Sequence, residues 1–149
     1  MDGNTGNGTE TIEYKLKTAN DSAYSTSVPT DAGEYTVRVT IAASTNYQGG
    51  TATADFTITK AAISPTVTIA GWTYGGTAST PVLTGNSGNG AVTYEYKKQS
   101  EADSAYSTTV PTNAGDYTIR ATVAESKNYL GNTATADFSI AKGTNPAVV

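Results

Sequence analysis

An internal repeat without gaps constrains the fold of this chain more than any other feature. Residues 3–60 align with residues 85–142 at a constant offset of 82 positions, and 37 of the 58 paired positions are identical. The stretch PTDAGEYTVR at 29–38 returns as PTNAGDYTIR, and TATADF returns unchanged. Self-similarity at a fixed period predicts tandem copies of one structural unit, so one fold must serve twice.

The repeating unit is 82 residues long and is best bounded at residues 61–142. Residues 1–60 then form a truncated first copy, which lacks the counterpart of residues 61–84. The tail at 143–149 resembles the start of a further copy. Another boundary stays open, in which residues 61–84 complete the first copy and leave the second one short.

Alternation of apolar and polar residues with period two predicts strands in both copies. EYTVRVTIA at 34–42 places Tyr35, Val37, Val39 and Ile41 on one face, and DYTIRATVA repeats the pattern. The other expected strands are TIEYKLK (11–17), TATADFTI (51–58), TVTIA (66–70) and TPVLT (80–84). About six or seven short strands per complete copy predict an all-β chain of tandem two-sheet β-sandwich modules.

Composition excludes several classes of function. The chain has no Cys and no His, which removes disulfides, thiolate nucleophiles, Cys/His zinc sites and an imidazole base. The net charge of −4 with no basic stripe argues against nucleic-acid binding, and no apolar run is long enough for a membrane span. Two pairs of equivalent carboxylates, Glu34/Asp116 and Asp55/Asp137, fall on outward strand positions. We therefore predict no enzyme, no catalytic residue, no metal and no cofactor.

The loops GNTGNG at 3–8 and GNSGNG at 85–90 superficially resemble ion-binding loops. Asp2 would supply a carboxylate to the first loop, but its equivalent in the second copy is Thr84. Gly and Asn tolerate the positive φ angles that tight turns require. The interpretation we favour is a hairpin turn in both copies.

The segments DAGEYTV and NAGDYTI resemble the start of a late strand in immunoglobulin-type domains. There a tyrosine hydroxyl bonds back to the upstream backbone, an arrangement known as the tyrosine corner. The resemblance implies this role for Tyr35 and Tyr117. The cysteine found two residues later in such domains is replaced by Val37 and Ile119, so no disulfide would support the fold.

Further motifs belong to the same pattern. WTYGGT at 72–77, NYQG and NYLG before the last strand, and the FxIxK-like joins resemble the MBG-type, YDG/YGX-like repeats of bacterial surface proteins and adhesins. Gly75 stands where the YDG triplet has Asp. The resemblance implies immunoglobulin-like modules in tandem, an extracellular or cell-surface location, and a stalk or adhesion role.

Trp72 and Tyr74 are the sharpest candidates for ligand contact, because aromatic faces can stack on sugars. The alternative is that Trp72 packs under a loop. The repeated loop tyrosines, Tyr24/Tyr106 and Tyr47/Tyr129, either are exposed or anchor their loops. Lys15 and Lys97 are formal candidates for Lys–Asn isopeptide bonds, but alternation predicts that they point outward into solvent, which disfavours that chemistry.

Two functional hypotheses follow. The first is a non-catalytic spacer whose partners are neighbouring repeats of the same chain. The second is a module that binds a glycan or a host protein through its loop aromatics. The truncated copy adds a further expectation: its open sheet edge can associate with another copy, borrow strands, or leave part of the unit disordered.

Overall fold

The computed structural model describes residues 3–146, and its regular structure consists of strands and two three-residue 3-10 helices. The prediction of an all-β chain is confirmed. No helix in this part of the chain is long and apolar enough to cross a membrane. The chain divides into two compact units, unit 1 at Met1–Lys60 and unit 2 at Ala61–Val149. Asp2 and residues 147–149, which entered the sequence interpretation, lie outside the described residues.

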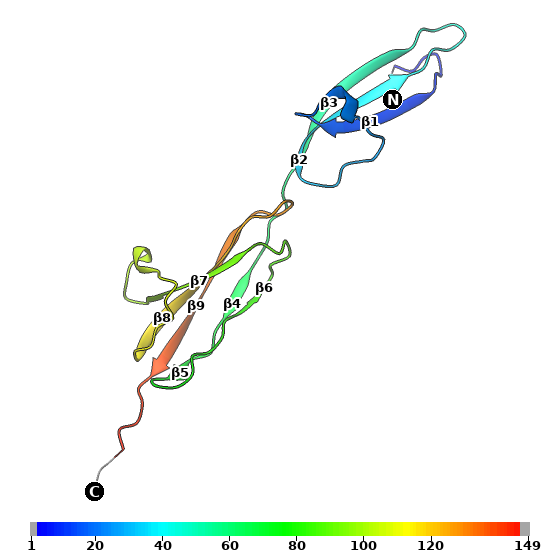
Figure 1. The fold of residues 1–149 in the computed structure, drawn as a ribbon. Coiled ribbons are helices and arrows are strands. Elements are labelled where there is room, and N and C mark those ends of the chain that lie inside the picture. The colour runs from blue at the N-terminus through cyan, green and yellow to red at the C-terminus, as the bar shows by residue number, and fades with distance from the viewer. Residues whose placement is uncertain (1–2, 147–149) are drawn as a thin grey trace. The chain divides into compact units, whose positions relative to one another are not determined.

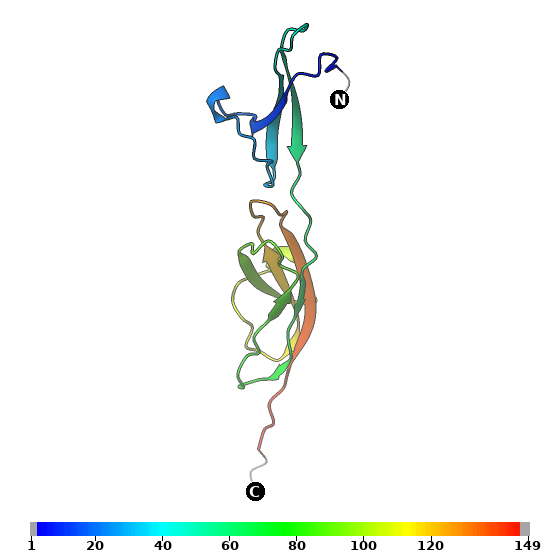
Figure 2. The ribbon, with the colours of Figure 1, turned by 90° about the vertical axis from the view of Figure 1, so that its right-hand side faces the viewer.

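Unit 1 is a single antiparallel sheet with strand order β1-β2-β3 (Figure 1). Its elements are β1 (Glu10–Leu16), the 3-10 helix η1 (Asp21–Ala23), β2 (Gly33–Ile41) and β3 (Gly50–Ile58). The pairing places Tyr14 opposite Val37, and Val37 opposite Ala54, so the predicted apolar positions share one face. Figure 2 shows the three strands as one layer.

Unit 2 is a two-sheet β-sandwich. Its elements are β4 (Thr66–Thr68), β5 (Trp72–Thr73), β6 (Val82–Thr84), β7 (Val92–Lys98), the 3-10 helix η2 (Asp103–Ala105), β8 (Gly115–Val123) and β9 (Asn132–Ala141). One sheet pairs β4 with β6, and the other has the order β5-β9-β8-β7. Strands β7, β8 and β9 repeat β1, β2 and β3 in the same register, with Glu95 opposite Arg120 as Glu13 lies opposite Arg38.

The leading segment of unit 2, residues 61–84, packs within that unit: it forms the whole β4–β6 sheet and adds β5 to the edge of the larger sheet (Figure 1). Ala61 forms a parallel bridge with Tyr129, and Trp72 pairs in parallel with Ile140. Between these two points the segment leaves the edge of β9 and pairs through β4 with β6. One continuous segment thus forms the smaller sheet and also pairs with the larger one, which joins the two layers.

The core of unit 2 lies between the two sheets. Val67 from β4 joins a buried cluster made up of Tyr96, Tyr117, Ile119, Ala121, Phe138 and Ile140. Ile119 and Ala121 are fully inaccessible to solvent. Full burial of one large apolar side chain contributes about 1.5–3 kcal/mol to stability. This cluster is therefore a principal source of the stability of unit 2.

The equivalent face of unit 1 has no second sheet over it. Among the described residues of unit 1 only Tyr35 is buried. Ile12 is 39% exposed and Leu16 is 51% exposed, although alternation correctly assigns both to the apolar face. The apolar side chains of unit 1 stay exposed because unit 1 lacks the counterpart of residues 61–84, which covers this face in unit 2.

Candidate functional sites

The Trp72–Tyr74 segment lies at the edge of the larger sheet of unit 2. Strand β5 runs beside the end of β9, and the Tyr74 amide donates to the Ala141 carbonyl at 2.8 Å. The Trp72 ring stacks on Phe138 with centroids 5.2 Å apart and an interplanar angle of 22°. One face of Trp72 is thereby occupied by the core, whereas Tyr74 is 56% exposed.

A shallow depression of about 440 Å³ adjoins these aromatics. It is lined by Trp72, Tyr74, Gly75, Gly76, Ala78, Val110, Pro111, Thr112 and Asn113. Gly75 has φ of +81°, a conformation that places a turn beside Tyr74 and that side chains other than Gly strain to adopt. The lining contains aromatic, aliphatic, hydroxyl and amide groups and no carboxylate, ammonium or guanidinium, so its chemistry suits an uncharged, hydroxyl-rich or apolar group.

Tyr35 and Tyr117 occupy the same place in their units. The Tyr117 hydroxyl donates to the Asn113 carbonyl, and the Tyr35 hydroxyl to the Asp31 carbonyl, each at 3.0 Å. The Tyr117 ring also stacks on Phe138 at 5.7 Å. Each tyrosine therefore ties the loop before its strand to the core, and Asn113 belongs both to this bond and to the depression.

The two Gly-Asn loops are turns held by their own amides, but the prediction of hairpins is wrong, because residues 85–90 connect β6 and β7, which belong to different sheets. The Asn4 side chain donates to the Gly8 carbonyl at 2.9 Å and accepts from the Gly8 amide at 3.1 Å. Asn86 makes the same pair with Gly90 at 2.9 and 3.0 Å. A Cβ at Gly90 would clash with the Ala124 carbonyl, which explains the glycine. Residues 3–146 contain no group of three or more His, Cys, Asp or Glu side chains that could hold a metal.

The loop tyrosines Tyr24 and Tyr106 are packed rather than freely exposed. The Arg38 guanidinium carbon lies 3.8 Å from the Tyr24 ring centroid, and Arg120 lies 3.9 Å from that of Tyr106. Each arginine also donates twice to one oxygen of a cross-strand glutamate, Glu13 or Glu95. Stacking and charge-assisted bonds together hold the 3-10 loop on the outer face of the sheet.

The expectation that Lys15 and Lys97 point into solvent is wrong. Both side chains are only 11% exposed, because the same 3-10 loop covers the outer face on which alternation places them. The Lys97 ammonium donates to the Glu101 carbonyl at 2.7 Å and lies 3.5 Å from Asp103. Each amine thus has oxygen partners within its own loop, the Ala19 carbonyl and Asp21 for Lys15 and the Glu101 carbonyl and Asp103 for Lys97.

The repeated carboxylates form cross-strand contacts on exposed faces. The Asp55 carboxylate accepts from the Thr36 hydroxyl at 2.7 Å and lies 3.1 Å from the Lys17 ammonium. The hydrogen bond from Thr36, followed by that from Lys17, lowers the pKa of Asp55 below its ordinary value. In unit 2 Asp137 accepts from Thr118 at 2.6 Å, and Asp116 accepts from Ser139 at 2.7 Å.

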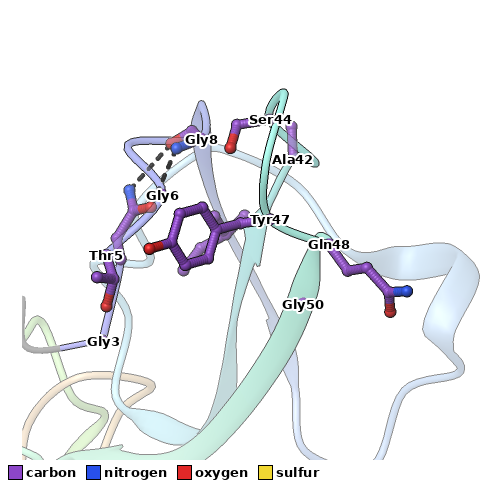
Figure 3. Close-up of a pocket in the computed structure, with 11 residues that line it drawn as sticks. Gly3, Thr5, Gly6, Gly8, Ala42, Ser44, Tyr47, Gln48 and Gly50 are labelled. Atoms are coloured by element: carbon purple, nitrogen blue, oxygen red, sulfur yellow. Dashed lines mark hydrogen bonds between the residues drawn. The ribbon is translucent and has the colours of Figure 1, made fainter.

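The apolar face of unit 1 is a second candidate site. We call it the open face and define it by Ile12, Val39, Ile41, Ala52 and Phe56. Two hollows adjoin it, of about 160 and 420 Å³, and both are lined by Gly3, Asn4, Ile41 and Gly50. Figure 3 shows the smaller hollow, with the Tyr47 ring lying across the Gly-Asn loop. Tyr47 is 53% exposed there.

Sequence reasoning missed two of these features. The Arg–Tyr–Glu cluster joins residues from β1, β2 and the 3-10 loop, and the signal that could have revealed it is the identity of all three residues in both copies. Strand β5 has only two residues, too few for any periodicity.

Comparisons with known proteins fit this architecture. Neither the curated proteins nor the solved structures gave a match. A family model described as MBG domain matches the chain twice, over residues 5–62 and 65–144. The two matches fall almost entirely on separate units and together span most of the chain. The resemblance carried by the YGG, AGxYT and NYxG motifs is confirmed: the chain belongs to the MBG domain family.

Proposed function

We propose that this chain is a non-catalytic spacer from an extracellular bacterial surface protein or adhesin, in which tandem MBG repeats project or link other domains. Membership of the MBG family suggests a surface-protein repeat domain. The residues that repeat between the copies engage in contacts within their own unit, such as the Tyr117–Asn113 and Tyr35–Asp31 bonds. Residues that repeat for this reason maintain the fold of each copy and need not bind a ligand.

The observation that carries the proposal is the parallel arrangement of the first and last segments of unit 2. The Ala61 amide donates to Asn128 and the Leu130 amide donates to Ala61, both at 2.8 Å, while Trp72 pairs in parallel with Ile140. Because the two segments run in the same direction, tension applied through the chain acts across these bonds together instead of opening them one by one. This geometry suits a module that transmits load.

Force spectroscopy on the full chain tests the spacer role. Since the chain has no cysteine, engineered pairs give unique attachment points. Attachment at Ala62→Cys and Lys142→Cys loads the parallel segments in shear. Attachment at Asp116→Cys and Lys142→Cys peels β8 from β9, since Asp116 lies opposite Ser139 near the end of β9. We expect a clearly higher unfolding force for the first pair; equal or lower force would contradict a load-bearing role.

A second candidate function is recognition of a glycan or a host protein at the depression beside Tyr74. Its support is the exposed Tyr74 ring next to a hollow lined by uncharged groups. Because Trp72 stacks in the core, loss of binding on Trp72→Ala would not separate contact from unfolding. Tyr74→Ala is the sharper variant for a glycan array, and the equally exposed Tyr47→Ala in unit 1 is its matched control. Binding that survives Tyr74→Ala would exclude this site.

A further inference from the structure

We propose that the open face of unit 1 is an acceptor site for a polypeptide segment with the sequence pattern of residues 61–84. The equivalent face of unit 2 is covered by that segment, whose own residues Ile63 and Val67 are each only 5% exposed. Unit 2 therefore displays what an occupant of this face looks like: an extended strand pair with apolar residues at alternate positions.

A matched pair of glycines locates the missing segment. A Cβ at Gly85 would clash with the Ser64 carbonyl, whereas a Cβ at the equivalent Gly3 would meet nothing within 4 Å. Other equivalent glycines have the same neighbours in both units: a Cβ at Gly6 or Gly88 would lie 2.7 Å from Cβ of Tyr47 or Tyr129. The loop is thus built alike in both copies, and what differs at Gly3 is the absent segment.

The second element of the site is the main-chain edge formed by β3 and the residues just before it. In unit 2 Ala61 exchanges hydrogen bonds with the Asn128 carbonyl and the Leu130 amide. The equivalent groups in unit 1 belong to Asn46 and Gln48, and in residues 3–60 no further strand lies on the outer side of β3. These hydrogen bonds involve only main-chain groups. The replacement of Leu130 by Gln48 therefore leaves the same carbonyl and amide able to bond to an added strand.

The two hollows of unit 1 coincide with the place of residues 63–65 in the other unit. The Asn132 side chain donates to the Ile63 carbonyl at 3.0 Å, and Gly85 faces Ser64 and Pro65. The positions equivalent to Asn132 and Gly85 are Gly50 and Gly3, which line both hollows. Figure 3 labels them in the smaller one. The side chain of an incoming residue like Ile63 would enter apolar space beside Ile41. Its carbonyl would lack the hydrogen bond that Asn132 donates in unit 2, because the equivalent residue in unit 1 is Gly50.

The alternative occupant is the open face of a second copy. Two such faces offer each other apolar side chains, but face-to-face packing leaves the edge of β3 without main-chain partners. An extended segment satisfies both the face and the edge, as it does in unit 2. The geometry therefore favours the segment.

Titration of the full chain with a synthetic peptide of residues 61–84 tests the proposal. We expect calorimetry to give one peptide per chain. We also expect amide hydrogen exchange to slow by about tenfold or more at Gln48, whose equivalent Leu130 donates to Ala61, and at Val39 and Ile41, which the new segment would bury. Amides of β9 should be unchanged, since that strand already has its partner.

Matched variants separate specific docking from non-specific adhesion. A peptide carrying Val67→Asp should lose binding, because a charge would enter the apolar interface, whereas Thr68→Asp, which points outward, should bind as before. On the chain, Ala52→Asp should weaken binding by about tenfold or more, and its neighbour Thr53→Asp should not. Ala52 is exposed in unit 1, so this change leaves the sheet folded.

Three results would overturn the proposal. The first is absence of binding at millimolar peptide. The second is altered protection on β9, which would mean that the peptide exchanges into unit 2. The third is concentration-dependent protection of the open face without peptide, together with a dimer in sedimentation, which would assign the face to a second copy.

Discussion

The Arg120 guanidinium carbon lies 3.9 Å from the ring centroid of Tyr106, so the arginine is held between this ring and the Glu95 carboxylate. Arg120 belongs to β8 and Tyr106 follows the 3-10 helix, and the contact therefore joins a loop to the outer face of the sheet. The same relationship between Arg38 and Tyr24 is present in unit 1.

We predict that Tyr106→Ala lowers the free energy of unfolding of unit 2 by about 1–2 kcal/mol, the range expected for a partly buried cation–π contact. Arg120→Lys in the otherwise unchanged chain should also lower the free energy of unfolding, because lysine cannot both stack flat on Tyr106 and donate twice to Glu95. Trp72 is the only tryptophan and lies in unit 2, so its fluorescence during urea unfolding reports on that unit. A Tyr106→Ala variant with an unchanged midpoint would contradict a stabilising role for the contact.

Tyr117→Phe removes the hydrogen bond to the Asn113 carbonyl while keeping the ring on Phe138. We expect a loss of about 1 kcal/mol, the usual net value of one hydrogen bond. The control is Tyr74→Phe, whose ring is exposed and which should change stability by less than about 0.5 kcal/mol. Equal midpoints for the two variants in urea would remove the tyrosine corner as a source of stability.

Trp72→Ala should destabilise unit 2 by about 2–4 kcal/mol, because it removes a ring that stacks on Phe138 beside the core. Tyr74→Ala, two residues away and exposed, should have little effect. Differential scanning calorimetry is the suitable measurement, since the variant lacks the fluorescent reporter. A small effect at Trp72 would mean that its ring is a free surface platform.

Stability of unit 2 should fall in alkaline solution. Burial raises the pKa of Tyr96 and of Tyr106, so the folded state favours the neutral phenols more than the unfolded chain does. This contribution is complete below about pH 10, the ordinary pKa of tyrosine, and is lost as the pH rises through the higher folded pKa values. Urea midpoints measured from pH 8 to 11 should decline above that point, and Tyr96→Phe should make the decline less steep. A decline as steep in Tyr96→Phe as in the wild type would exclude Tyr96 as a contributor.

The strands themselves were predictable because period-two alternation reports directly which side chains share a face. Tyr117, Ile119, Ala121 and Val123 are all buried, as the pattern in DYTIRATVA indicates. The degree of burial was not predictable in the same way. Val39 and Ala121 occupy equivalent positions, yet only Ala121 is fully buried, because burial depends on which segment covers the face.

The outer faces illustrate the same limit. Alternation assigns Lys15 to the face opposite the core, and that assignment holds. Its shielding comes from the loop four to six residues further along, through the Ala19 carbonyl and Asp21, and no periodic pattern encodes such a fold-back. The depression beside Tyr74 arises in a similar way, since it combines residues near 75 with residues near 111.

The identical register of the two sheets has a consequence for how such genes change. Glu13 opposes Arg38 as Glu95 opposes Arg120, and the offset of 82 positions is constant. Unequal recombination between the two copies would join them at equivalent codons. A hybrid with the first strand of one copy and the second strand of the other would still set Glu13 opposite Arg120. The number of copies can therefore change in steps of 82 residues while the register of every strand is kept.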